Sequence, residues 1–117
     1  RLFRRAANKG HAAAQCELGR CFEFGMGMPQ DDDEAVHLYR RAAELGDASG
    51  QYCLGKCYAH GGGVPQYDRV AVHLFGRAAE QDNPLGQYNS ARCYQRGEGV
   101  PQDIGEAARL FGLAAEQ

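Results

Sequence analysis

The sequence predicts an all-α solenoid built from tandem helix-loop-helix repeats. Three consecutive segments align without a gap at a period of 36 residues, and each contains two helical stretches separated by a glycine-rich loop. Arg-Ala-Ala opens every segment, at residues 5, 41 and 77. We therefore expect one repeat array over residues 1–117, with these parts: a partial second helix at 1–9 and repeats at about 10–45, 46–81 and 82–117.

The first helix of each repeat is expected at residues 12–24, 48–60 and 84–96. Its apolar stripe follows an i, i+4, i+8 spacing, as in Ala14, Leu18 and Phe22. Gly19 and Gly55 follow the central leucine and weaken the helix, which indicates that a neighbouring helix approaches too closely for a side chain.

Glycines and a proline end each first helix, at residues 25–29, 61–65 and 97–101. Gly-x-Gly here is a turn signal and not a phosphate-binding loop, because no strand precedes it and no Lys-Ser/Thr follows.

Acidic residues predict the start of each second helix. Asp31 and Asp103 are the expected caps in the first and third repeats, and Asp68 takes this role in the second. Gly46 closes the second helix, and Asp47 caps the next first helix.

Composition excludes several classes of protein. A net charge of −2 gives no bulk attraction to nucleic acid, and no stretch approaches the roughly 20 apolar residues of a membrane span. Five cysteines fit a disulfide framework poorly, so a soluble protein in a reducing intracellular compartment is favoured. The sequence lacks an initial Met, and it begins and ends within the second helix of a repeat. Both features indicate a piece of a longer array.

The order of these signals closely resembles the Sel1-like repeat, a relative of the tetratricopeptide repeat, over essentially the whole chain. The order is a small residue, Leu-Gly, an aromatic residue, Gly-x-Gly-Val, Asp, Ala, an aromatic residue, Ala-Ala and Gly. The third repeat departs from it, with Ser90-Ala91 for Leu-Gly and Asp82 for the closing Gly. The resemblance implies a right-handed superhelix of helix pairs that acts as an adaptor or scaffold for other proteins.

Stacked repeats create an extended concave surface lined by the first helices. Stepping 100° per residue from Leu18 places a basic and aromatic set of residues, together with Cys16, on the open face. This set is the predicted partner-binding surface: Arg20, Lys56, Arg92, Arg96, Tyr52, Tyr88, Phe24 and His60. It suits a protein or peptide that carries acidic groups. The alternative is a polar surface that only maintains solubility.

The cysteines are interpreted as small buried residues. Cys21, Cys57 and Cys93 occupy equivalent positions, about 8–10 Å apart on stacked helices and too distant for disulfides. Cys53, Cys57 and His60 share a helix face and offer a weaker zinc-binding or redox-sensing alternative. No cofactor and no metal is predicted.

No catalytic constellation is present in the sequence, because Ser49 and Ser90 lack the context of a nucleophile and the paired carboxylates cap helices. The predicted function is non-catalytic binding of a partner protein or peptide. A second candidate is end-to-end self-association through apolar terminal helices.

Overall fold

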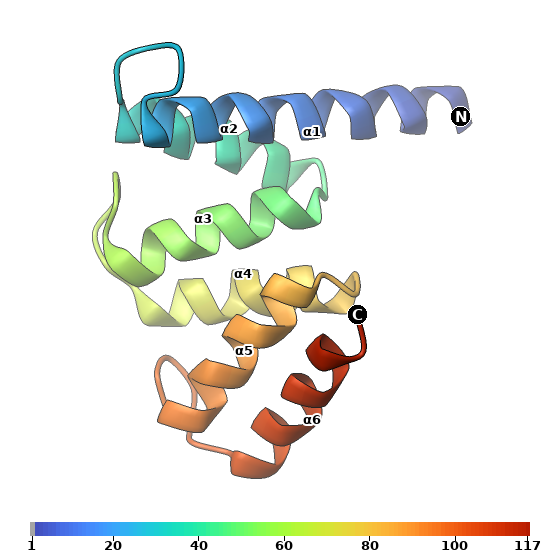
Figure 1. The fold of residues 1–117 in the computed structure, drawn as a ribbon, viewed down its shortest axis with the longest axis vertical. Coiled ribbons are helices and arrows are strands. Elements are labelled where there is room, and N and C mark those ends of the chain that lie inside the picture. The colour runs from blue at the N-terminus through green and yellow to red at the C-terminus, as the bar shows by residue number, and fades with distance from the viewer. Residues whose placement is uncertain (1) are drawn as a thin grey trace.

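The computed structural model describes the backbone of residues 2–117 and the side chains of residues 10–117. Within these residues the chain forms helices and no strand (Figure 1). The six helices are α1 (Leu2–Phe24), α2 (Asp32–Glu44), α3 (Ala48–His60), α4 (Asp68–Glu80), α5 (Pro84–Arg96) and α6 (Ile104–Ala115).

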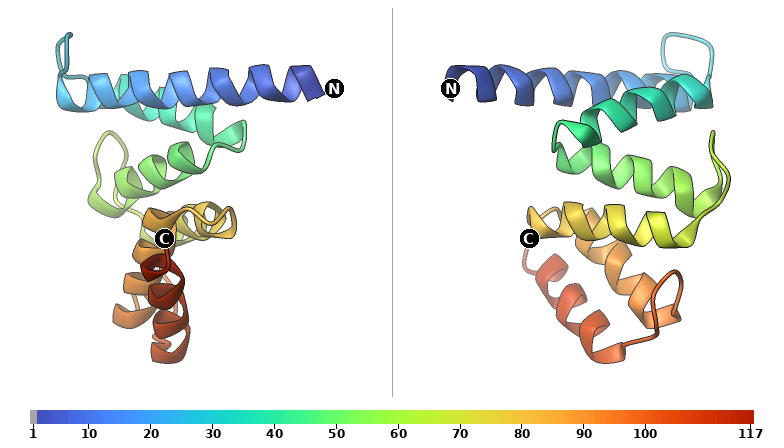
Figure 2. Two further views of the ribbon diagram at one scale, coloured as in Figure 1. Left: turned by 45° about the vertical axis from the view of Figure 1, so that its right-hand side comes forward. Right: turned by 180° about the vertical axis from the view of Figure 1, so that it is seen from behind.

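The helices pack as three successive pairs. α1 packs on α2, α3 on α4 and α5 on α6, and each pair also contacts the next through α2 with α3 and α4 with α5. Each pair is turned relative to the one before, so that α5 and α6 run steeply across the direction of α1 (Figure 2). The predicted all-α repeat superhelix is thereby confirmed. The first helices also touch one another, α1 with α3 and α3 with α5, which aligns equivalent residues along one side of the molecule.

The boundary expected between residues 1–9 and the first helix is absent, because α1 is continuous from Leu2 to Phe24. At the two later junctions Gly46 and Asp82 adopt positive φ, and Asp47 and Asn83 then cap the next helix. The first junction has His11 in place of this capping residue, and its backbone remains helical. Gly10 is the equivalent of Gly46, but residue 11 is not one of the preferred capping residues, so a new helix start is not favoured there.

Most of the predicted turns and caps are confirmed. Asp31 and Asp103 accept hydrogen bonds from the backbone amides three residues on, and Gly61 takes the left-handed conformation that ends α3. The prediction for Asp68 was wrong: Tyr67 holds the cap position of α4 without a side-chain bond, and Asp68 is the first helical residue.

The predicted apolar stripe is buried on α3 but not on α1. Leu54 is 4% exposed, whereas its equivalent Leu18 is 41% exposed. α3 has α2 on one side and α4 on the other, while α1 packs on α2 and α3 only. No helix in residues 2–117 is both long and apolar enough to cross a membrane.

Candidate functional site

The residues predicted to bind a partner all lie at least partly exposed on α1, α3 and α5. We call this surface the basic face. They occupy three rows of equivalent positions, with Arg20, Lys56 and Arg92 in the first row. The second row has Tyr52 and Tyr88, and the third has Phe24, His60 and Arg96.

Two of the cations are stacked on tyrosines of the same helix. Lys56 Nζ lies 5.5 Å from the ring centroid of Tyr52, and the guanidinium of Arg92 lies 5.8 Å from that of Tyr88. The tyrosine rings are in turn held against the second helices: the centroid of Tyr52 is 6.0 Å from that of Phe75, and Tyr88 meets Phe111 edge to face at 5.6 Å. Cation–π contact therefore orients both charges without neutralising them.

Several basic side chains already have acidic partners, but these two do not. Arg20 pairs with Glu17 at 3.3 Å, and Arg96 pairs with Glu98 at 3.7 Å. Among the ion pairs of residues 10–117, neither Lys56 nor Arg92 takes part. Their charges are the ones that the basic face can offer to a ligand.

A hollow of about 300 Å³ opens on this face between α3 and α5. The corresponding hollow between α1 and α3 measures about 60 Å³. In the smaller one Glu23 lines the wall and accepts a hydrogen bond from the hydroxyl of Tyr39. One repeat later these two residues are Ala59 and Phe75, and both line the larger hollow. The larger volume of the hollow between α3 and α5 follows from the smaller side chains there, because Ala59 lacks the carboxylate of Glu23 and Phe75 lacks the hydroxyl of Tyr39.

The larger hollow has an apolar wall and a charged rim. Phe75 and Ala71 supply apolar surface, while His60, Arg92 and Arg96 approach from the ends of α3 and α5. Asp68 and Glu98 also border it, and Glu98 already pairs with Arg96. The structure thus brings three of the eight predicted residues together here, while Phe24, 60% exposed, lies outside both hollows.

Sequence reasoning misplaced one residue of the open face. Cys16, expected there, is 1% exposed, and its thiol lies next to that of Cys53 on the neighbouring α3. The pKa of Cys53 is lowered, first by its interaction with the Cys16 thiol and then by the nearby Arg20 and Lys56, while this interaction and burial raise the pKa of Cys16. Cys16 and Cys53 are 37 residues apart, one more than the repeat period. They are therefore not equivalent positions, and a comparison of equivalent cysteines does not reveal their contact.

The residues of the zinc alternative do not gather into a site. Cys53 and Cys57 are buried, and burial raises the pKa of Cys57 to about 12, whereas His60 is exposed at the end of the helix. In the part of the chain that the structure describes, no three His, Cys, Asp or Glu side chains are arranged to hold a metal ion.

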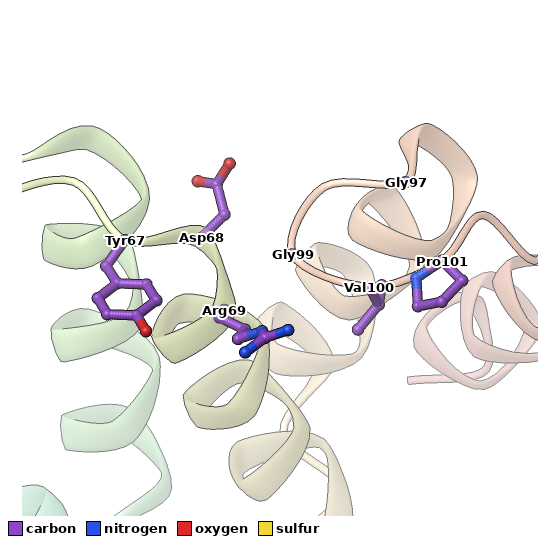
Figure 3. Close-up of a pocket in the computed structure, with 7 residues that line it drawn as sticks. All are labelled: Tyr67, Asp68, Arg69, Gly97, Gly99, Val100 and Pro101. Carbon is purple, nitrogen blue, oxygen red and sulfur yellow. The ribbon is translucent and has the colours of Figure 1, made fainter.

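A further hollow, of about 530 Å³, lies between the start of α4 and the loop at 97–101. Figure 3 shows that the carboxylate of Asp68 and the guanidinium of Arg69 point in different directions from α4, with Val100 facing them from the loop. A Cβ added at Gly99 would lie 2.5 Å from the carbonyl oxygen of Asp68. This hollow is the edge of a tight contact between repeats, and its polar groups do not converge on a ligand.

The stacked helix pairs and the aligned rows on their first helices define the class of protein as an α-helical repeat scaffold. The sequence model of the Sel1 repeat matches residues 1–11, 12–47, 48–83 and 84–117, so the chain belongs to the Sel1 repeat family. Sel1 repeat proteins are generally non-catalytic modules for protein interaction.

Solved structures similar to this chain carry the same fold. A protective antigen from uropathogenic Escherichia coli strains, with an SLR fold, is 39% identical with a TM-score of 0.89 over 98% of this chain. A Sel1 repeat protein from Oxalobacter formigenes is 31% identical with a TM-score of 0.86 over 96%. The chain spans 25% and 44% of these two proteins.

Cysteine-rich protein B of Helicobacter pylori is 20% identical, with a TM-score of 0.77 over 96% of this chain and 86% of that protein. At this identity the likeness shows the fold alone. No protein in the comparison with curated proteins matches this chain.

Proposed function

We propose that the basic face is the concave, partner-binding surface of this repeat array and that it binds an acidic segment of another protein. The observation that carries the proposal is the repeated placement of Lys56 over Tyr52 and of Arg92 over Tyr88, because the aromatic ring orients each charge and neither cation forms an ion pair within residues 10–117. A cation held rigidly on an aromatic ring loses little side-chain entropy when it binds a carboxylate.

The hollow between α3 and α5 supports a specific arrangement of the ligand. Carboxylates of the bound segment pair with Lys56 and Arg92, and one apolar side chain enters the hollow against Phe75. The smaller hollow, which Glu23 lines, is about 60 Å³ and leaves too little room for such a side chain. We therefore expect acidic residues near a single apolar anchor rather than a uniformly acidic sequence.

The test uses selection from a library of random 12-residue peptides displayed on phage. We expect peptides bound by the parent protein to be enriched in Asp and Glu near an apolar residue. Binding of these peptides should fall at least tenfold in the Lys56→Glu/Arg92→Glu variant, because two attractions become repulsions. The matched control is Arg41→Glu/Arg77→Glu, which changes the same total charge at exposed, equivalent positions of α2 and α4. Selection without acidic enrichment, or equal losses in both variants, would refute the proposal.

A second candidate is self-association through α1, favoured by the exposure of Leu18 where its equivalent Leu54 is buried. Sedimentation equilibrium of the parent protein and of Leu18→Glu decides between them. Dimers that disappear in the variant support self-association, and a monomer in both excludes it.

A further inference from the structure

A second cleft, of about 350 Å³, lies between α4, α5 and α6. Leu110 and Leu113 of α6 and Ala79 of α4 give it apolar walls, and Ser90 lines it from α5. Ser90 precedes Arg92 by two residues, which places them about 200° apart around the helix. The cleft is therefore separate from the basic face.

Comparison with the preceding repeat explains why this cleft is open. The positions of Gly76 and Ser90 are occupied one repeat earlier by Arg40 and Leu54. Leu54 is buried there, and Arg40 lies 5.8 Å from the ring centroid of Tyr58 and donates a hydrogen bond of 2.9 Å to its hydroxyl. The tyrosine is kept one repeat later, as Tyr94, whereas the two large side chains are not, and Gly76, Ser90 and Tyr94 all line the cleft.

The hydroxyl of Ser90 is left without a partner by this exchange. Ser90 is 3% exposed, and its Oγ makes no hydrogen bond within the described part of the chain. A buried hydroxyl without a partner is unfavourable, because it has lost its bonds to water and gained none in return. A group that enters the cleft and bonds to Ser90 would remove this penalty.

The charged residues around the cleft favour a positively charged ligand group. Glu80, Asp82 and Glu106 line it, against a single cation, Arg109. Arg109 is already paired with Glu106, so the carboxylates of Glu80 and Asp82 are left in excess. Arg69 and Arg77 border the adjoining hollow, which shares Glu80 and Tyr94 with the cleft, so we expect a bound cation on the side of Glu80 and Asp82 that faces away from them.

We propose that this cleft binds the side chain of an arginine presented by a partner peptide. Its guanidinium takes the place that Arg40 holds in the preceding repeat, over the ring of Tyr94 and near Glu80 and Asp82. The aliphatic part of the side chain packs on Leu110 and Leu113, and one N–H of the guanidinium donates a hydrogen bond to the unpaired hydroxyl of Ser90. The site is independent of the basic face and of the function proposed for it.

The experiment is a titration of ¹⁵N-labelled protein with N-acetyl-L-arginine amide, followed by NMR. We expect saturable shifts at Gly76, Ser90 and Tyr94, with a dissociation constant on the order of 1 mM, as suits so small a ligand. N-acetyl-L-leucine amide and N-acetyl-L-glutamine amide should bind at least fivefold more weakly. Equal binding of the three amides, or no shift at these residues with arginine amide at 20-fold the expected constant, overturns the proposal.

Two variants locate the binding. Gly76→Arg/Ser90→Leu restores the side chains of the preceding repeat and should weaken binding at least tenfold while raising Tm. Glu80→Gln/Asp82→Asn changes only exposed positions, preserves the fold and should weaken binding severalfold. Lys56→Glu/Arg92→Glu should bind the arginine amide as the parent does, so the two proposals fail independently. Undiminished binding in the Glu80→Gln/Asp82→Asn variant refutes the site even if the first variant does not fold.

Discussion

The hydroxyl of Tyr39 on α2 donates a hydrogen bond to the carboxylate of Glu23 on α1. Tyr39 is fully buried and Glu23 half-buried. One repeat later both members are replaced, by Phe75 and Ala59, and neither half of the pair is left alone. Neither copy therefore leaves a tyrosine hydroxyl buried without its acceptor.

This relationship predicts strong coupling in a double-mutant cycle. Tyr39→Phe should reduce the free energy of unfolding by about 1.5 kcal/mol, because a hydrogen bond to a charged group is lost. Glu23→Ala should cost about 2 kcal/mol, because it leaves the buried hydroxyl without an acceptor. The double variant should cost at least 1 kcal/mol less than the sum, as measured by urea unfolding. Additive losses would show that the two side chains act separately.

Stability should decline at alkaline pH because buried acids resist ionisation. Burial first, and the bond to Glu23 second, raise the pKa of Tyr39 above its ordinary value, and burial raises that of Cys57 to about 12. A raised pKa stabilises the folded state fully below the unfolded pKa, about 8.5 for a thiol and 10 for a tyrosine, and this contribution is lost as pH rises further.

We therefore expect the free energy of unfolding to fall from about pH 8.5, and more steeply above 10, by up to about 1.4 kcal/mol per pH unit for each group. Tyr39→Phe should reduce the slope above pH 10, and Cys57→Ala should reduce the slope that begins near pH 8.5, to which Cys93, with a pKa raised by burial to about 11, also contributes. Urea unfolding between pH 7 and 11 measures both slopes. Tyr67→Phe, at an exposed ring, is the control and should keep the parent slope. A Tyr39→Phe profile that superimposes on the parent profile would contradict the assignment.

Close packing between repeats predicts opposite effects for two glycine substitutions. A Cβ at Gly50 would lie 2.7 Å from the Cβ of Ala42 and 2.9 Å from the backbone nitrogen of Ala43. Backbone atoms cannot move aside without separating α2 from α3, so Gly50→Ala should cost about 1–3 kcal/mol. Gly112→Ala, on α6 with nothing within 4 Å, should instead stabilise by roughly 0.5–1 kcal/mol through helix propensity. Thermal unfolding of both variants decides the point, and destabilisation by Gly112→Ala would be inconsistent with the open space there.

Periodicity alone located the repeats, the caps other than that of α4, and the close approaches at Gly19 and Gly55. Gly19 and Gly55 were expected to face a neighbouring helix, and an added Cβ at either would lie 2.8 Å from an aromatic ring atom of the paired helix. Such features are local and recur at the 36-residue period, although the third repeat has Ala91 at the position of Gly19 and Gly55. The same periodicity placed the cations and tyrosines of the basic face at equivalent, exposed positions.

Differences between copies could be resolved only in the tertiary structure. Leu18 and Leu54 are the same residue in the same pattern, yet only Leu54 has a helix on both sides. The replacement of Arg40 and Leu54 by Gly76 and Ser90 is visible in the sequence, but the cleft that it leaves requires the packing of α4, α5 and α6.

The sequence by itself thus determined the repeat, its helices and the rows of side chains, because these depend on neighbours three, four or 36 residues away. The tertiary structure alone decided which side chains are covered, that Cys16 meets Cys53, and where hollows remain. These depend on how the helices of adjacent repeats pack, and a one-dimensional pattern does not contain that geometry.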